Sequence, residues 1–210
     1  MRNQAFTLLI LLAATAALSG CGNDTIAFTY RGDENSWKEA RQAAKAALAK
    51  KEYATAEKEY ATAVEYARHL QSTNPHHYIE TLYDLATAYE ADGKLSEAKK
   101  TFQEVLDASK ALCLEKNASE LYRRVGRFNV ANAWLNLGNI AKQEKDYATA
   151  ENCYKSGLAA SASHSTIDPT GGPLKIAYAD LLEMQGRDPA MVKRLREEAH
   201  TSGDGILEGL

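Results

Sequence analysis

The segment KDYATAENCYKSG, residues 145–157, decides the fold because its pattern occurs three times in the chain. It aligns without gaps with KEYATAEKEYATA, residues 51–63, and with GKLSEAKKTFQEV, residues 93–105. Each copy has a large apolar residue, an alanine three positions later, an aromatic residue four positions after that, and a small or apolar residue after three more. Spacings of three and four place these side chains on one face of a helix.

A second helix is predicted before each copy. In the third repeat it contains Trp134, Leu137 and Gly138, followed downstream by Ala150 and Tyr154. This arrangement resembles the tetratricopeptide repeat (TPR), a helix hairpin with the pattern W-x₂-L-G-x₂-Y…A-x₃-F. The second repeat matches the same pattern at seven positions: Leu82, Leu85, Ala86, Tyr89, Gly93, Ala98 and Phe102. The resemblance implies an all-α fold, a TPR-type α-solenoid of antiparallel helix hairpins.

The repeats are longer than those of most proteins with this pattern. Their key alanines are Ala56, Ala98 and Ala150, and Met191 continues the series. Repeats of about 42 residues, against a common length of about 34, resemble the long variety found in kinesin light chain. We predict four repeats over residues 36–200, the last of them a degenerate cap with a short basic helix. The wider interval before the third repeat should lengthen its first helix, over 118–144, with Gly126 as a candidate break.

Composition supports a helical protein and argues against nucleic acid as a ligand. The chain has 210 residues, 45% of them hydrophobic, and a formal net charge of -3. By direct count it contains 36 alanines but only 5 valines and 7 isoleucines, a balance that favours helices over strands. A slightly acidic chain gives no electrostatic reason to expect nucleic-acid binding.

The N-terminus has the features of a lipoprotein signal peptide. Arg2 precedes an apolar run over residues 5–18, which is too short to span a bilayer comfortably. The run ends in Leu-Ser-Gly-Cys, residues 18–21, and this resembles the lipobox of bacterial lipoproteins. The resemblance implies cleavage before Cys21 and acylation of Cys21 with diacylglycerol and fatty acids such as palmitate. Gly22, rather than Asp, follows the cysteine, and in the enteric sorting pattern this favours the outer membrane, facing the periplasm.

We therefore divide the chain into four parts. These are the signal peptide (1–20), a flexible tether after the lipidated cysteine (21–35), the repeat domain (36–200) and a short tail (201–210). The tether is assigned because residues 22–35 show no helical periodicity and contain glycine and turn-forming residues.

The family resemblance also predicts a groove for a partner. The first helices of TPR hairpins line a concave surface, and family positions place Arg41, Tyr83, Thr87 and Glu90 in it. Asn129, Asn132, Asn136 and Asn139 follow spacings of three and four, so they form one stripe on a helix. Amides both donate and accept hydrogen bonds, so such a stripe can hold the main chain of an extended peptide. The partner-binding residues predicted are Arg41, Tyr83, Thr87, Glu90, Asn132, Asn136 and Asn139.

Few residues point to chemistry. His76, His77 and Glu80 form the nearest approach to a metal cluster, but two exposed histidines in a first helical turn are the simpler interpretation. No nucleophile–base pair or phosphate-binding glycine loop is present in the sequence, so neither an enzyme nor a cofactor is predicted. Cys113 and Cys153 are predicted to be unpaired, partly buried thiols, because their offset positions should separate them beyond bridging distance.

The sequence thus predicts a membrane-anchored periplasmic TPR adaptor that binds another protein or an extended peptide. Two alternatives stay open. One is a structural subunit whose repeats stack on copies of themselves in a homo-oligomer. The other is a metal-binding protein or enzyme that uses His76, His77 and Glu80.

The lipid anchor is directly testable. Cys21→Ser should abolish lipid labelling in cells and leave the precursor uncleaved, because the modified cysteine is what the lipoprotein peptidase recognises. Metabolic labelling with a clickable fatty acid, followed by mass determination, measures both effects. Unchanged labelling and processing in the variant would contradict the lipobox interpretation.

Overall fold

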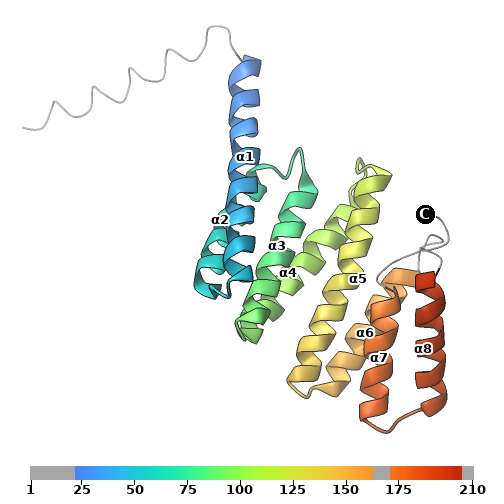
Figure 1. Cartoon of the computed structure of the whole chain (residues 1–210). Coiled ribbons are helices and arrows are strands. Elements are labelled where there is room, and N and C mark those ends of the chain that lie inside the picture. The colour runs from blue at the N-terminus through green and yellow to red at the C-terminus, as the bar shows by residue number, and fades with distance from the viewer. Residues whose placement is uncertain (1–21, 163–170, 205–210) are drawn as a thin grey trace, which may run out of the picture.

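The structure, a computed structural model, describes residues 22–162 and 171–204. Within these ranges the chain forms eight helices and no strand, as Figure 1 shows. Their bounds are α1 Gly22–Ala49, α2 Tyr53–His69, α3 Pro75–Ala91, α4 Leu95–Leu114, α5 Glu120–Gln143, α6 Tyr147–Ala162, α7 Gly171–Met184 and α8 Pro189–Asp204.

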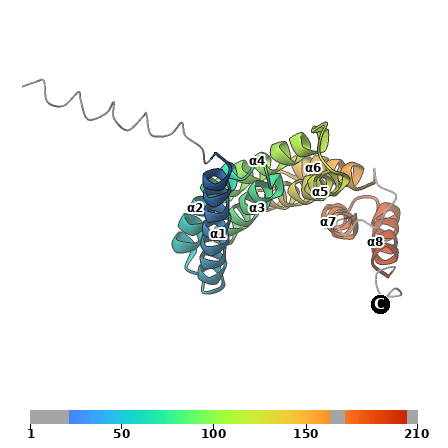
Figure 2. The same ribbon diagram turned by 90° about the horizontal axis from the view of Figure 1, so that it is seen from above.

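The helices form four antiparallel hairpins that stack in chain order. Each helix packs on the next, and α5 also contacts the first helices of the neighbouring hairpins, α3 and α7. Seen from above, the stack curves, with α3, α5 and α7 toward its inner side and α4 and α6 toward its outer side (Figure 2). The predicted all-α solenoid of four helix hairpins is therefore confirmed.

The centre of each of the first three hairpins contains a fully buried alanine and a buried aromatic ring. Ala56, Ala98 and Ala150 have no exposed surface, and the aromatic side chains four residues after them are at most 2% exposed. Those aromatic residues are Tyr60, Phe102 and Tyr154. Alanine lets two helix backbones approach closely, and the aromatic ring fills the space beside the contact. The repeat phase deduced from the sequence is thus correct.

One backbone conformation closes every hairpin. Lys51, Gly93, Lys145 and Gly186 have φ angles of 62°, 77°, 62° and 65°, in the left-handed region. Each of the first three lies five residues before the buried alanine of its repeat. This residue ends the first helix in the manner of a left-handed C-cap. Counting residues from this position identifies equivalent positions in the four hairpins.

The long first helix of the third hairpin is also confirmed. Helix α5 runs without interruption from Glu120 to Gln143, so Gly126 does not break it. A Cβ atom at Gly126 would lie 2.8 Å from Cys113 Sγ and 3.0 Å from the carbonyl oxygen of Ser109. The glycine is needed because α4 and α5 approach each other closely at this point.

The predicted tether is wrong in its secondary structure, because α1 is helical from Gly22 onward. Three interactions explain the helix near its centre. Glu34 accepts a 2.7 Å hydrogen bond from Lys38, Asp33 lies 3.8 Å from His69 of α2, and Trp37 is buried. Once α2 and α3 fix these residues, extending the helix toward residue 22 requires little further free energy.

The C-terminal boundary of the repeat domain differs slightly from the prediction. Helix α8 continues to Asp204, four residues beyond the predicted end of the repeat domain. The predicted signal peptide, Cys21 and residues 205–210 lie outside the described residues. None of the described helices combines the length and apolar character needed to cross a membrane.

The two described cysteines agree with the sequence prediction. Cys113 and Cys153 are both free thiols, the first partly buried and the second buried. Burial raises the pKa of each thiol, which keeps both in the unreactive protonated form at neutral pH.

The left-handed turn residue gives a stability prediction. Lys145→Gly should raise the free energy of unfolding by about 0.5–1 kcal/mol, because a lysine pays a steric cost at positive φ that glycine avoids. Gly93→Ala should lower it by a similar amount, since nothing lies within 4 Å of the added Cβ atom and only the backbone is strained. Urea unfolding of both variants at one protein concentration measures these changes. A Lys145→Gly variant less stable than Lys145→Ala would contradict the shared conformation.

Candidate partner-binding groove

The concave face is built from equivalent positions on the four first helices. Counting back ten residues from each left-handed residue gives Arg41, Tyr83, Leu135 and Ile176. Because first helices of successive hairpins lie side by side on the inner side of the curve (Figure 2), these side chains form one row across it. The row changes from a charged residue at the N-terminal end to aliphatic residues at the C-terminal end.

The N-terminal half of this face is closed by internal ion pairs. Arg41 Nε donates to Asp84 Oδ2 at 2.6 Å, and Arg41 Nη1 donates to Glu80 Oε2 at 3.1 Å. The Arg41 side chain is only 20% exposed, and Lys45 Nζ lies 3.8 Å from the same aspartate. Arg41 therefore joins the first two hairpins, and its charge is neutralised by carboxylates of α3.

Trp37 and His77 form the buried contact beneath these charges. Their rings stack with centroids 3.7 Å apart, and Trp37 Nε1 donates to Thr81 Oγ1 at 2.8 Å. The guanidinium of Arg41 lies 5.4 Å from the centre of the indole ring. The expectation of two exposed histidines is wrong for His77, because the long α1 brings the Trp37 ring over it and leaves it 9% exposed.

The alternative metal site is not assembled. His77 is stacked under Trp37, whereas Glu80 is paired with Arg41. The ring of His76 contacts two aromatic rings, His77 at 4.2 Å and Tyr122 at 5.5 Å between centroids. Across residues 22–162 and 171–204, no group of three or more His, Cys, Asp or Glu side chains is arranged to hold a metal ion.

The asparagine stripe has internal roles that the sequence did not reveal. Asn129 is buried and donates to the carbonyl oxygen of Val125 at 2.9 Å. Asn136 Nδ2 donates to Tyr83 Oη and to the carbonyl oxygen of Asn132, both at 2.9 Å. Asn136 thus links α5 to α3.

Asn139 supports a buried aromatic ring. Its Oδ1 accepts a 2.9 Å hydrogen bond from Tyr154 Oη, whose ring is fully buried in the third hairpin. A Cβ atom on the neighbouring Gly138 would lie 2.5 Å from the same ring, so the aromatic side chain packs directly on the α5 backbone. Fold stability, as well as any partner binding, should therefore depend on Asn139.

The remaining predicted groove residues are accessible to different degrees. Thr87 is exposed, and its hydroxyl donates to the carbonyl oxygen of Tyr83 at 2.9 Å. Glu90 is half-buried, and burial raises the pKa of its carboxyl group. Asn132 is half-buried, and its side chain makes no hydrogen bond to the described part of the chain. Asn132 is therefore the stripe's amide that a partner can engage without breaking an internal contact.

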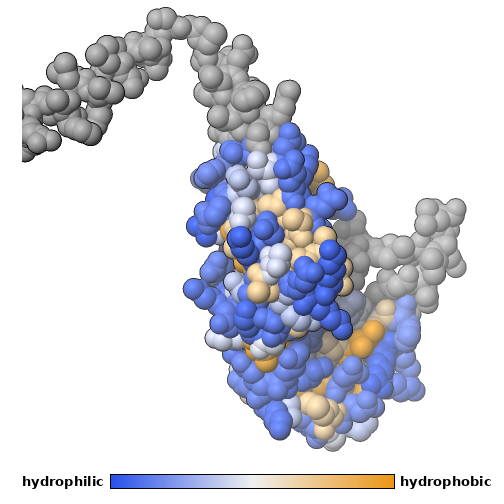
Figure 3. Space-filling view, turned by 60° about the vertical axis from the view of Figure 1, so that its left-hand side comes forward, coloured by the Kyte–Doolittle hydropathy of each residue, from blue (hydrophilic) through white to orange (hydrophobic). Residues whose placement is uncertain are grey.

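Sequence reasoning missed the apolar surface beside Asn132. Phe128 and Ile176 are large hydrophobic side chains that remain 43% and 44% exposed. Leu135 is half-buried; it follows Phe128 by seven residues on α5 and has the same register position as Ile176 on α7. Figure 3 shows hydrophobic surface in the hollow beside the C-terminal helices, in contrast to the mainly hydrophilic N-terminal end. Extending the groove positions to the fourth hairpin would have identified Ile176 from the sequence.

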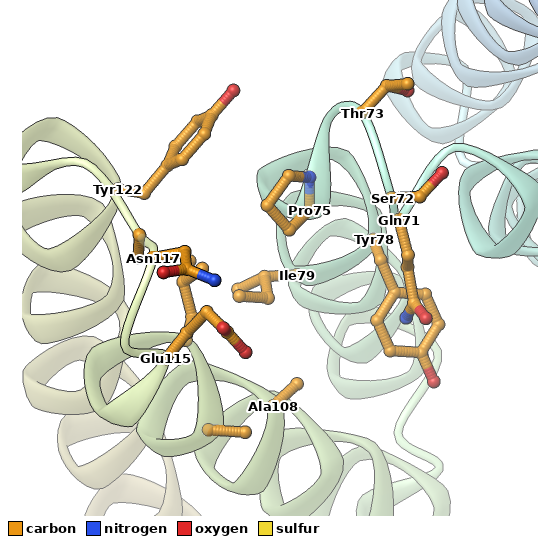
Figure 4. A pocket seen from close by; sticks show the side chains of 13 residues that line it. Gln71, Ser72, Thr73, Pro75, Tyr78, Ile79, Ala108, Glu115, Asn117 and Tyr122 are labelled. Carbon is orange, nitrogen blue, oxygen red and sulfur yellow. The ribbon is translucent and has the colours of Figure 1, made fainter.

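A separate depression lies at the edge of the stack, away from the predicted groove residues. Its volume is about 530 Å³. Pro75, Ile79 and Tyr78 come from α3 and face side chains of α4 and of the segment leading into α5, as Figure 4 shows. Apolar atoms dominate its lining, but none of the residues predicted to bind a partner contributes to it.

Comparison with known proteins agrees with this geometry. Residues 79–112 and 131–164 match the family model described as tetratricopeptide repeat. The fold is a TPR-type α-solenoid. The matched segments correspond to most of the second and third hairpins, and repeats of this type are generally scaffolds for protein–protein interaction rather than enzymes.

A similar solved structure is titled "Crystal structure of BtubC (BKLC) from P. vanneervenii". It is 16% identical, and the alignment covers 86% of this chain and 91% of that chain with a TM-score of 0.38. No curated protein matches the chain.

The Trp37–His77 stack predicts a pH dependence. Burial, followed by the charge of His76, lowers the pKa of His77 from 6.5 to about 4, while Glu34 opposes the shift and Arg41 and Lys38 add to it. As pH falls below 6.5 the unfolded chain binds the proton first. Stability from this group is therefore lost progressively as pH falls from the unfolded to the folded pKa, by roughly 3 kcal/mol in total.

A matched variant isolates this effect. His77→Phe keeps a stacking ring but cannot titrate, so its free energy of unfolding should fall less between pH 6.5 and 4 than that of the parent chain. Urea unfolding at several pH values measures the difference. Parallel curves for the two proteins would show that His77 does not control acid stability.

Proposed function

We propose that this protein is a membrane-anchored periplasmic adaptor that binds an extended segment of another protein on the C-terminal half of its concave face. The observation that carries the proposal is the row formed by half-buried Leu135 and exposed Ile176 beside Asn132. Large exposed apolar side chains on a concave surface are typical of a binding site.

The arrangement fits an extended peptide better than a globular surface. Aliphatic side chains on neighbouring helices can contact alternate side chains of a strand-like ligand, and an amide can pair with its main chain. The N-terminal half contributes less, because Arg41, Glu80 and Asp84 are occupied with one another. We therefore expect binding to depend mainly on apolar contact and only weakly on salt.

The proposed location in the envelope has a different basis. The apolar run before residue 18 and the Leu-Ser-Gly-Cys sequence that ends at Cys21 support a lipid anchor. Gly22 at the next position supports outer-membrane sorting. An anchored scaffold would hold its partner at the membrane, which is a way to raise the local concentration of a second component.

The binding site can be tested without knowing the natural partner. A library of phage-displayed twelve-residue peptides would be selected on the chain from residue 22 onward, and affinities of selected peptides measured by fluorescence anisotropy. Leu135→Ser combined with Ile176→Ser should weaken binding about tenfold or more, because each change removes roughly 1–2 kcal/mol of apolar contact.

The matched control changes two leucines outside the groove. Leu114→Ser combined with Leu121→Ser alters equally large exposed side chains at the α4–α5 connection and should leave peptide affinity unchanged. Melting temperatures of both double variants check that the fold is intact. Equal affinities of the two double variants for the selected peptides would place the binding site elsewhere.

A further inference from the structure

The connection between α4 and α5 exposes the two most accessible large hydrophobic side chains described. Leu114 at the end of α4 is 82% exposed and Leu121 in the first turn of α5 is 64% exposed. Leaving both in water has no structural benefit, since neither belongs to a hydrophobic cluster of the fold. An exposed apolar pair of this kind indicates contact with another surface.

The same segment is strongly basic in an otherwise slightly acidic chain. Residues 110–127 contain five basic side chains and two acidic ones, whereas the whole chain has a net charge of -3. The basic residues are Lys110, Lys116, Arg123, Arg124 and Arg127. An apolar pair surrounded by positive charge is complementary to an anionic phospholipid surface, where leucines enter the interface and cations meet headgroups.

Some of these charges have internal partners and two do not. Arg127 pairs with Glu120 at 2.5 Å, and Arg123 donates to the carbonyl oxygens of Glu115 and Lys116. Lys116 and Arg124 are not ion-paired with any residue in the described ranges. These two side chains are therefore available to headgroups.

The α4–α5 connection lies at the same edge of the stack as the start of α1. Helices α1, α3 and α5 each end two residues before the left-handed residue of their hairpin, so their lengths can be compared from a common level. Helix α1 has 28 residues and α5 has 24, whereas α3 has only 17. At about 1.5 Å per residue, α5 and α1 extend about 10 Å or more beyond α3 at the same edge. Figure 1 shows the start of α1 and the α4–α5 connection at the same, upper edge of the stack.

The geometry points to a membrane-contacting edge: Leu114, Lys116, Leu121 and Arg124 lie on the anionic bilayer to which residue 21 is attached. This inference rests on the proposed membrane anchoring but is independent of the peptide groove. Two points of attachment, the start of α1 and this edge, fix the orientation of the solenoid on the bilayer. The aliphatic groove positions Leu135 and Ile176, farther along the first helices, then stay in the aqueous phase.

The test uses the chain from residue 22 onward, which lacks the lipidated cysteine. All described hydrophobic clusters lie between Trp37 and Ala199, so this chain keeps the packing of the fold. Binding is measured by co-sedimentation with two kinds of vesicle, pure phosphatidylcholine and a mixture of phosphatidylcholine with anionic phosphatidylglycerol at about one lipid in three. We expect binding to the anionic vesicles only, and weaker binding as salt is raised.

Two double variants probe the two components of the edge. Lys116→Gln with Arg124→Gln should reduce vesicle affinity about 25-fold, about fivefold for each charge. Leu114→Ser with Leu121→Ser should reduce it about tenfold. Leu135→Ser with Ile176→Ser is the control and should bind vesicles like the parent chain.

The outcomes separate this inference from the anchor and the groove. Failure of the parent chain to bind anionic vesicles, or unchanged binding by both edge variants, overturns the membrane-contacting edge. An edge that instead binds a protein would give no vesicle binding, and crosslinks to a protein from a photoreactive residue at position 114 would be lost when Lys116→Gln and Arg124→Gln are added. Lipid labelling of Cys21 is measured on the full chain, so failure of the anchor is seen separately.

Discussion

Close approach of helix backbones at a few small residues is the constraint on which the rest of this structure depends. Ala56, Ala98 and Ala150 are completely buried at the crossing of their hairpins. Gly138 lets the ring of Tyr154 pack directly on α5. Larger side chains at these positions would separate the helices, and separated hairpins could not stack into a curved surface. The shape of the concave face, and the exposure of the residues on it, therefore depend on close packing between the helices of each hairpin.

Most of the fold could be predicted because its signals are local and periodic. Alanine and aromatic residues three and four positions apart fixed the helix faces, and their recurrence fixed the hairpins. The start of α1 could not be predicted in this way, because residues 22–35 have no apolar stripe and their helix depends on Trp37 meeting His77 of another hairpin. The role of Gly126 was also ambiguous in the sequence, because glycine is found both where a helix breaks and where two helices approach closely.

The candidate site was only partly predictable, because the sequence shows which face a residue occupies but not what lies opposite. Arg41 is predicted from the sequence to be a partner-binding residue, yet Asp84 neutralises it across a hairpin boundary. Asn136 and Asn139 occupy the expected stripe, but tyrosines 53 and 15 residues away in sequence engage their amides. Polar residues at the groove thus hold helices together, Arg41 and Asn136 between hairpins and Asn139 within one. The accessible surface that remains in the C-terminal half includes aliphatic Leu135 and Ile176.

We propose that partners meet the concave face of this solenoid at the membrane, and site-specific photo-crosslinking in cells is the most direct test of this. A photoreactive amino acid would replace Ile176, exposed on the first helix of the fourth hairpin, or Lys100, exposed on a second helix. We expect a discrete protein of the membrane fraction to crosslink to position 176 and not to position 100. Equal crosslinking at both positions, or crosslinking only at position 100, would contradict it.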